Sequence, residues 1–318
     1  MPPISQNPRD GLRPRVICYY QTYFPNNGTK YVSMLPLCTN RTGVSHVILA
    51  AFHINEDAES ITLNDDSPDD PRYAPLWTEV RMLQAAGVKI MGMLGGAAKG
   101  SFRRLDGELH DFEHYYTPLR DMIRARGLDG LDLDVEEEMS LKGVIRLINS
   151  LKSDFGDGFI ITLAPVATAL IRGLEHLSGF NYFALEEQMG SKISWYHAQF
   201  YNGWGGIADT SMYDAIIANH WNPEKIVAGV LSNPRNGSQG YVPMDRLSDV
   251  LARLMYRYPS FGGVSGWEYF NALPGGEHKP WQWAAIVSLV FGMRDIVEIA
   301  VNLGVRSTAK KVLGSQNP

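Results

Sequence analysis

Three acidic side chains alternate with apolar ones near the middle of the chain, in Asp132-Leu133-Asp134-Val135-Glu136. Successive side chains of a β-strand point to opposite faces, so the alternation places the three carboxyls on one face. Neighbouring carboxyls are then roughly 6 to 7 Å apart along the strand. Burying them together disfavours ionisation and should raise the pKa of at least one. A carboxyl that keeps its proton near neutral pH can act as a general acid.

Two other interpretations of this stretch are a solvated acidic turn and a divalent metal site. Acidic surface runs do not usually alternate strictly with leucine and valine. A metal site would recruit a histidine or a further carboxylate, and no other predicted strand end offers one cleanly. No nucleotide fingerprint, phosphate-binding glycine loop or Ser-His-Asp order stands out either. The pattern therefore favours catalysis, with no metal and no cofactor.

The elements that position these acids alternate in type along the whole chain. Eight β-branched or apolar runs are predicted as strands, at 16–21, 45–53, 89–94, 130–135, 159–163, 195–201, 225–231 and 263–268. Helical patterns lie between them, at 74–86, 113–126, 141–154, 212–219 and 243–258, and a final helix follows Trp283. Alternating strands and helices are typical of a parallel sheet with crossover helices.

Because no linker or change of composition divides this pattern, we expect the α/β class and a single (β/α)8 TIM barrel over residues 1–318. Residues 1–14 and 306–318 are expected to be tails. The acids would face the barrel interior, with Leu133 and Val135 turned toward the helices. Chemistry in such barrels lies at the C-terminal ends of the strands.

Composition and charge exclude several classes of partner. The 318 residues include 34 acidic and 29 basic side chains, a net charge of −5. A mildly acidic chain lacks the positive charge that nucleic acids and anionic membranes attract. The apolar stretch 283–303 contains Arg294, Asp295 and Glu298, so it is interpreted as a packed helix and not as a membrane span. A monomer is expected.

The two cysteines and the N-terminus bear on location. Cys18 and Cys38 lack disulfide-framework or zinc spacing and are expected to be free thiols, with Cys18 buried in a strand. Residues 1–15 show no signal-peptide core, so a cytoplasmic location is expected. Three glycosylation sequons, at Asn27, Asn40 and Asn236, argue the other way. A secreted protein whose signal was removed is therefore the alternative.

The acidic strand carries a family resemblance. Asp129, Asp132, Asp134 and Glu136 stand at the spacing of the Asp-x-x-Asp-x-Asp-x-Glu signature, and the stretch resembles that of family 18 glycoside hydrolases. The family contains chitinases, endo-β-N-acetylglucosaminidases that act on N-glycans, and lectin-like members that have lost the acid. The resemblance implies a retaining, substrate-assisted hydrolase.

That resemblance also implies roles for the acids. Glu136 would protonate the glycosidic oxygen while the substrate's own 2-acetamido carbonyl attacks the anomeric carbon, which gives an oxazolinium intermediate. Asp134 would orient the acetamido N–H, and Asp132 would share a proton with Asp134. Glu136 would then act as the base that activates water.

Further segments are similar to the family in the same order along the chain. The segment 89–96 resembles the third-strand motif, with Met93 in place of its serine and with Gly95 and Gly96 interpreted as structural. In 199–202, the resemblance gives Tyr201 the role of holding the acetamido oxygen, and Gln199 and Asn202 are weaker substrate-binding candidates.

Aromatic residues supply the remaining site candidates. Trp267 is similar to the eighth-strand tryptophan that forms the floor beneath the reacting sugar. Tyr19 and Phe52 match inward aromatics of the first and second strands. Trp204 lies in a glycine-rich segment, 202–210, that is interpreted either as a lid that reads the glycan or as a packed loop.

Substrate class is weighed among three possibilities. Glu136 is present, which argues against a non-catalytic lectin. Ala97 follows the paired glycines where many chitinases have tryptophan, and the segments 198–205 and 266–271 resemble small fungal endo-β-N-acetylglucosaminidases. The sequence therefore predicts hydrolysis of the GlcNAc-β1,4-GlcNAc core linkage, with N-glycans or glycoproteins as partners. The alternatives are a chitinase and a glycan-binding or chitin-binding lectin.

Overall fold

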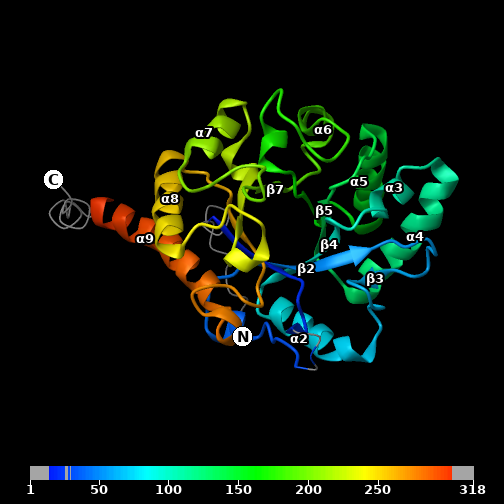
Figure 1. The fold of residues 1–318 in the computed structure, drawn as a ribbon, viewed down its shortest axis with the longest axis horizontal. Helices are drawn as coiled ribbons and strands as arrows, with labels where there is room; N and C mark the ends of the chain where they lie inside the picture. The colour runs from blue at the N-terminus through cyan, green and yellow to red at the C-terminus, as the bar shows by residue number, and fades with distance from the viewer. Residues whose placement is uncertain (1–13, 26–27, 29, 303–318) are drawn as a thin grey trace.

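Eight parallel strands close into a barrel in the computed structural model, which describes residues 14–25, 28 and 30–302 (Figure 1). The strands are β1 (Arg15–Tyr20), β2 (His46–His53), β4 (Lys89–Gly95), β5 (Gly130–Asp134), β6 (Ile160–Leu163), β7 (Trp195–Gln199), β8 (Ile226–Leu231) and β9 (Gly263–Trp267). β1 pairs with both β9 and β2, so the sheet has no open edge between its first and last barrel strands. The predicted (β/α)8 barrel is confirmed.

Helices surround this barrel. Six match the predicted segments: α2 (Ala74–Ala85), α4 (Leu109–Arg126), α5 (Leu141–Phe155), α7 (Ser211–Ala218), α8 (Met244–Arg257) and α9 (Gln282–Asn302). The sequence analysis did not predict α1 (Pro36–Thr39), α3 (Ser101–Leu105), α6 (Tyr182–Met189) or the antiparallel β3 (Thr62–Leu63). Short 3-10 turns lie at Pro71–Tyr73, Ala167–Leu170, Pro223–Lys225, Pro234–Asn236 and Gly276–His278.

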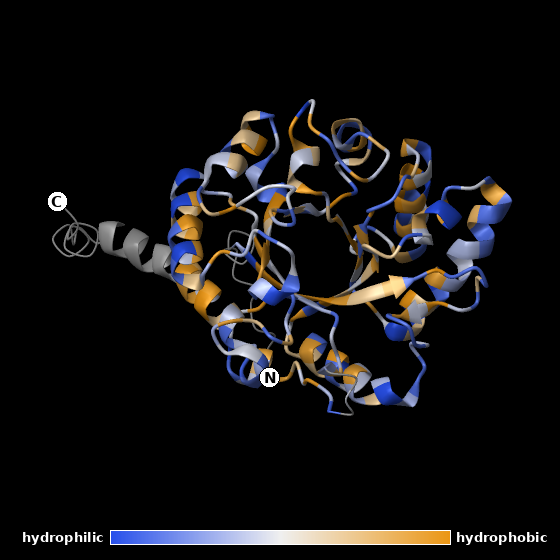
Figure 2. Ribbon diagram, in the orientation of Figure 1, coloured by the Kyte–Doolittle hydropathy of each residue, from blue (hydrophilic) through white to orange (hydrophobic). Residues whose placement is uncertain are grey.

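The hydrophobic core has two parts, one on each side of the strands. The larger lies between strands and helices and includes Leu131, Leu133 and Val135. The smaller fills the barrel and includes Ile17 and Met91. In Figure 2 the strands are largely hydrophobic, while hydrophilic residues lie mainly on the loops and the outer helix faces. The apolar residues that alternate with the acids of β5 therefore point outward, as predicted.

The position of Phe52 differs from the prediction. Phe52 is fully buried in the outer part of the core, and its ring lies where a Cβ on the outward-facing Gly92 would be. The register between β2 and β4 shifts between Leu49 and Phe52, and both Ala50 and Ala51 belong to the barrel interior. Because this irregularity breaks the two-residue period, Phe52 faces the helices and does not line the site.

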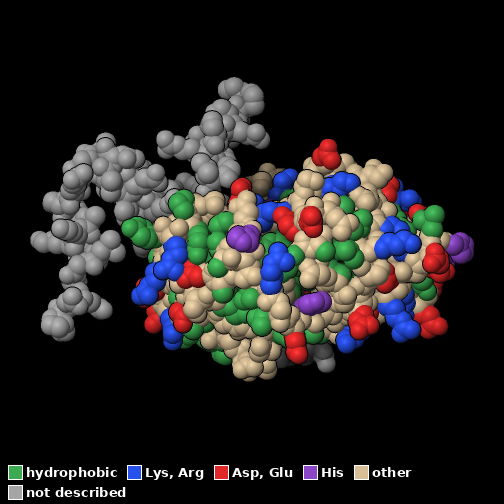
Figure 3. Space-filling view, turned by 90° about the horizontal axis from the view of Figure 1, so that it is seen from above, with side chains coloured by type: hydrophobic (Ala, Val, Ile, Leu, Met, Phe, Trp, Pro, Cys, Tyr) green, Lys and Arg blue, Asp and Glu red, His purple; other side chains and the backbone are tan. Residues whose placement is uncertain are grey.

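The remaining expectations concern the termini, the thiols and the surface. The tails predicted at 1–14 and 306–318 lie outside the described residues, apart from residue 14. Cys18 is buried and both cysteines are free. Within the described part of the chain, no helix combines the length and apolarity needed to cross a bilayer. Figure 3 shows acidic and basic side chains mixed over one face of the molecule.

Candidate active site

The acidic strand β5 is fixed at its beginning by Asp129. Its carboxylate accepts the Ile90 N–H at 2.9 Å and the side-chain amide of Gln84 at 2.9 Å, and it pairs with Lys89 at 3.0 Å. These contacts tie β5 to β4 and α2 at the N-terminal end of the barrel. The first aspartate of the motif therefore sets the register of the strand, and it lies away from the other three acids.

Asp132 lies deepest in the barrel. Its side chain is fully buried, and its two oxygens accept the Tyr19 hydroxyl at 2.8 Å and the Thr162 hydroxyl at 2.6 Å. Burial raises the pKa of Asp132 to about 6, against the lowering effect of these two hydrogen bonds. No hydrogen bond joins Asp132 to Asp134 within the described residues. The two oxygens of Asp132 contact the Tyr19 and Thr162 hydroxyls in this structure, and the proton shared with Asp134 stays a prediction.

Gln199 links the other two acids instead. Its Nε2 lies 3.0 Å from Asp134 Oδ1, 3.3 Å from Glu136 Oε1 and 2.9 Å from the carbonyl oxygen of Ala164. An amide nitrogen carries two hydrogens, so three acceptors compete for two donors. The arrangement places both carboxyls on the same side of β5, as the alternation predicts. Gln199 was predicted to contact substrate, and here it holds the acids.

Both of these carboxyls resist ionisation. Burial, followed by the nearby charges of Glu136 and Asp132, raises the pKa of Asp134 well above its usual range. Burial also raises the pKa of Glu136, while the Gln199 hydrogen bond and the Lys99 charge lower it. Glu136 thus keeps its proton to higher pH than an ordinary glutamate, which is the property required of a general acid.

The paired glycines at the end of β4 bring the backbone close to Asp134. Gly95 and Gly96 have φ of +92° and +88°. A Cβ on Gly95 would lie 2.6 Å from the carbonyl oxygen of Asp134, so only glycine fits there. The N–H of Gly96 donates to the same oxygen at 2.9 Å. Met93, in place of the family's serine, packs inside the barrel and leaves the acids without a hydroxyl at that position.

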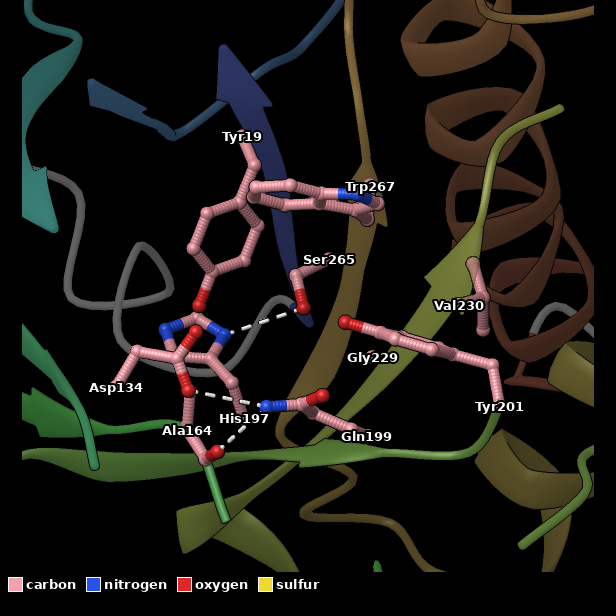
Figure 4. A pocket seen from close by; sticks show the side chains of 10 residues that line it. All are labelled: Tyr19, Asp134, Ala164, His197, Gln199, Tyr201, Gly229, Val230, Ser265 and Trp267. Atoms are coloured by element: carbon pink, nitrogen blue, oxygen red, sulfur yellow. Dashed lines mark hydrogen bonds between the residues drawn. The ribbon is translucent and has the colours of Figure 1, made fainter. Parts of the chain in front are cut away.

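Three aromatic residues meet Asp134 at a small internal cavity (Figure 4). Tyr19 and Trp267 lie with ring centroids 5.6 Å apart, and the hydroxyl of Tyr201 points into the cavity. The free volume is about 10 Å³, close to the room that one water molecule requires. Burial, together with Asp134 and Glu136, raises the pKa of the Tyr201 hydroxyl, so it remains a hydrogen-bond donor.

His197 and Ser265 complete this cavity, and the sequence analysis did not identify them. The indole N–H of Trp195 can only donate, and it lies 2.9 Å from His197 Nε2. The proton of the neutral ring is therefore on Nδ1, which donates to Ser265 Oγ at 3.1 Å. Burial lowers the pKa of His197 far below its usual value, so the ring stays neutral. The sequence feature that could have identified these two residues is a polar side chain inside an otherwise apolar strand.

Two of the predicted substrate-binding residues, Asn202 and Trp204, do not line the cavity. The side-chain oxygen of Asn202 accepts the backbone N–H of Ser238 at 2.8 Å, so Asn202 holds a neighbouring loop and does not line the cavity. Trp204 is half-buried against the outer part of the core. Trp204 packs as expected for a packed loop, and the glycan-reading role of 202–210 stays a prediction.

No group of three or more His, Cys, Asp or Glu side chains among the described residues is arranged to hold a metal ion. The available chemistry at the end of β5 is that of two carboxyls with raised pKa values, a tyrosine hydroxyl and a partly exposed indole ring. These groups can transfer a proton and hold a neutral polar ligand against an aromatic ring.

Comparisons with known proteins agree with this arrangement. A fungal chitinase, ChiC from Aspergillus fumigatus, is 63% identical, with a TM-score of 0.81 over 87% of this chain and 99% of that chain. A fungal endo-beta-N-acetylglucosaminidase of glycosyl hydrolase family 18 is 48% identical, with a TM-score of 0.83 over 87% of this chain and 98% of that chain. Chitinase 2 of Rhizopus oligosporus is 24% identical over 83% of this chain and 50% of its own length. The chain therefore spans about half the length of that curated relative.

The model of the glycosyl hydrolases of family 18 matches residues 15–235, which include β1 to β8 and all three acids of the site. This chain belongs to glycosyl hydrolase family 18.

Proposed function

We propose that the protein is a retaining endo-β-N-acetylglucosaminidase that cleaves the GlcNAc-β1,4-GlcNAc linkage in the core of N-glycans. The observation that carries the proposal is the bridge from Gln199 to both Asp134 and Glu136. It holds a general acid beside a second, more deeply buried carboxyl that has a strongly raised pKa. A carboxyl that keeps its proton is a poor nucleophile, so the substrate must supply the nucleophile itself.

In the first step, the protonated Glu136 gives its proton to the glycosidic oxygen. The bond from the anomeric carbon to that oxygen breaks, and its electron pair leaves with the oxygen as a hydroxyl group. The acetamido carbonyl oxygen of the same sugar attacks the anomeric carbon and closes a positively charged oxazolinium ring. The new positive charge favours the ionised form of the buried Asp134, and the proton of Asp134 passes to the neighbouring buried carboxyl of Asp132.

In the second step, water attacks the anomeric carbon on the face that the leaving group vacated. Glu136, now a carboxylate, takes a proton from that water. The oxazolinium ring opens and the acetamido group is restored. Two inversions at one carbon give net retention of configuration.

Two aromatic residues orient the sugar in both steps. The Tyr201 hydroxyl points into the cavity beside Asp134, where it can donate to the acetamido carbonyl oxygen. Trp267 presents a partly exposed ring at the end of β9, and a flat apolar ring suits the C–H face of a sugar.

The proposal that N-glycans are the substrate rests on the small side chains of the segment that follows β4. β4 is followed by Ala97 and Ala98, both exposed, so no aromatic platform extends from this strand. These small side chains leave room for a branched or peptide-bearing substrate. The similarity to the fungal endo-beta-N-acetylglucosaminidase at 48% identity supports the same choice. Chitin oligomers are the second candidate, which the 63% identity to the Aspergillus chitinase favours.

Mass spectrometry after parallel incubation with a biantennary Asn-linked glycopeptide and a chitin oligomer tests the proposal, with Glu136→Gln as the blank. We expect a peptide that retains one GlcNAc. Shortened chitin oligomers with an intact glycopeptide would instead show a chitinase. Binding without cleavage of either substrate would show a lectin.

A further inference from the structure

A second concavity, of about 760 Å³, lies beyond the ends of β4 and β5, which are across the barrel from β9 and its Trp267. It is formed by the segments that follow β4 and β5, and its lining includes Lys99, Arg103, Asp106, Glu137, Glu138 and Ser140. Lys99 is near enough to Glu136 for its charge to lower the pKa of that acid. Along the chain, Glu136 stands directly before Glu137, which lines this concavity, and two residues after Asp134, which lines the small cavity.

The position of Glu136 determines where the reacting sugar and the leaving group lie. Glu136 must contact the glycosidic oxygen, which joins the reacting sugar to the leaving group. The reacting sugar belongs with Asp134, Tyr201 and Trp267, so the concavity beyond Glu136 faces the leaving group.

Of the charged side chains that line the concavity, two acids have hydrogen-bond partners in the protein. The Glu137 carboxylate accepts the backbone N–H groups of Gly100 and Phe102 at 2.8 to 2.9 Å. Asp106 accepts the backbone N–H of Ser140 at 2.8 Å. These two acids are therefore committed to the ends of α3 and α5, and their charges are partly neutralised by the amide dipoles.

The other three charged side chains have no such partner. Lys99, Arg103 and Glu138 are exposed, and none forms an ion pair or side-chain hydrogen bond within the described residues. Two cations and one anion therefore remain to interact with a ligand. The balance favours a leaving group that carries negative charge.

We propose that this concavity binds the leaving-group side of the substrate, and that Lys99 and Arg103 select leaving groups that carry a carboxylate, such as an acidic peptide flanking the glycosylated asparagine. The inference rests on the cleavage proposed above and adds the class of leaving group.

Two matched substrate pairs test this inference. The first is one N-glycan on two peptides that differ only in aspartate against asparagine beside the glycosylated residue. The second is a chitin oligomer labelled at its reducing end with 2-aminobenzoate or with the neutral 2-aminobenzamide. For each pair, the ratio of kcat/KM between the acidic and neutral members is measured. Exposed ion pairs are weak, so we expect a preference of about two- to tenfold for the acidic member at low salt.

Variants then assign the preference to this concavity. Arg103→Gln should reduce the ratio and Arg103→Glu should reverse it, whereas Glu138→Gln should increase it. Arg81→Gln removes an exposed positive charge at the C-terminal end of α2, near the beginning of β5, and should leave the ratio unchanged. Salt at about 0.5 M should bring the wild-type ratio toward one, because it screens exposed charges.

A wild-type ratio of one at low salt, or a ratio that Arg103→Glu does not change, would overturn the inference. The two substrate pairs separate this result from failure of the proposed function. If only the chitin oligomers are cleaved, N-glycan hydrolysis is refuted, and the labelled oligomers still measure the charge preference.

Discussion

The hydroxyl of Tyr19 donates to Asp132 Oδ2 at 2.8 Å, which joins β1 to β5 through the barrel interior across 113 positions of sequence. Thr162 on β6 donates to the other oxygen of the same carboxyl. Asp132 is therefore held by two hydroxyls, and both Asp134 and Glu136 contact Gln199. Three carboxyls with equal spacing in the sequence thus have different surroundings.

Asp132→Asn should stabilise the protein at neutral pH. The folded-state pKa of Asp132 is raised to about 6, from about 3.9 in an unfolded chain. Its contribution to stability is therefore fully present below pH 4 and is lost as the pH rises through 6. Asparagine avoids this loss, which is on the order of 3 kcal/mol. Denaturant unfolding from pH 4 to 8 measures it.

The control for that experiment is Asp249→Asn, which removes an exposed carboxylate from α8. We expect its difference from the wild type to be independent of pH. Equal pH dependence in the wild type and in Asp132→Asn would show that Asp132 is ionised without cost, contrary to its burial.

Glu136→Gln should lose hydrolysis by about 10²- to 10⁴-fold, because glutamine has no proton to transfer. Its thermal unfolding temperature should stay near that of the wild type, since the amide can still lie beside Gln199. Turnover at the wild-type rate on any GlcNAc-linked substrate would refute the assignment of the acid.

Asp134→Asn should separate the two chemical steps. The variant should fail to form the oxazolinium intermediate from an intact glycan, because asparagine cannot offset the developing positive charge. It should still accept a preformed oxazoline donor, in which that ring is already closed. Following both substrates by mass spectrometry checks this, and equal loss on both would contradict it.

Ser265 is expected to act through both its hydrogen bond and its size. Ser265→Ala leaves the buried Nδ1–H of His197 without its acceptor, which should cost about 1 to 3 kcal/mol in unfolding free energy. Ser265→Thr keeps the hydroxyl but adds a methyl group to a cavity of about 10 Å³. We expect Ser265→Thr to fold stably and to lose activity. Unfolding curves and kcat/KM for both variants decide whether the two effects separate.

Lys99→Gln should move the alkaline limb of the pH–activity profile to higher pH. The Lys99 charge lowers the pKa of Glu136 against the raising effect of burial. Removing the charge therefore raises that pKa, and the acid keeps its proton to higher pH. The shift should shrink in salt, because Lys99 is exposed. A shift to lower pH would show that Lys99 does not act on Glu136 through its charge.

Local sequence was sufficient to predict the elements that carry a clear period. The strict alternation in 132–136 identified β5 and the face of its acids. The apolar spacing in 243–258 identified α8. Both signals are local, because a buried face imposes a period of 2 on a strand and of 3.6 on a helix.

The missed elements depend on contacts between distant residues. α3 is a short helix whose first N–H groups are satisfied by the Glu137 carboxylate, 35 positions after Phe102. No cap is visible in its own sequence. α6 did carry a local signal, since Asn181 caps it by accepting the Phe183 and Ala184 N–H groups. Phe52 was wrongly placed because the irregularity in β2 breaks the period on which the prediction relied.

The sequence by itself determined which residue types are available and that β5 turns Asp132, Asp134 and Glu136 toward one side. Covalent spacing and strand geometry are sufficient for that. Only the tertiary structure decided that Asp132 accepts hydrogen bonds from Tyr19 and Thr162. It also decided that Gln199 contacts both Asp134 and Glu136. The hydrogen bond between His197 and Ser265 is likewise a tertiary contact. Hydrogen bonds and pKa values depend on which side chains the closed barrel brings within about 3 Å, and those partners come from different strands.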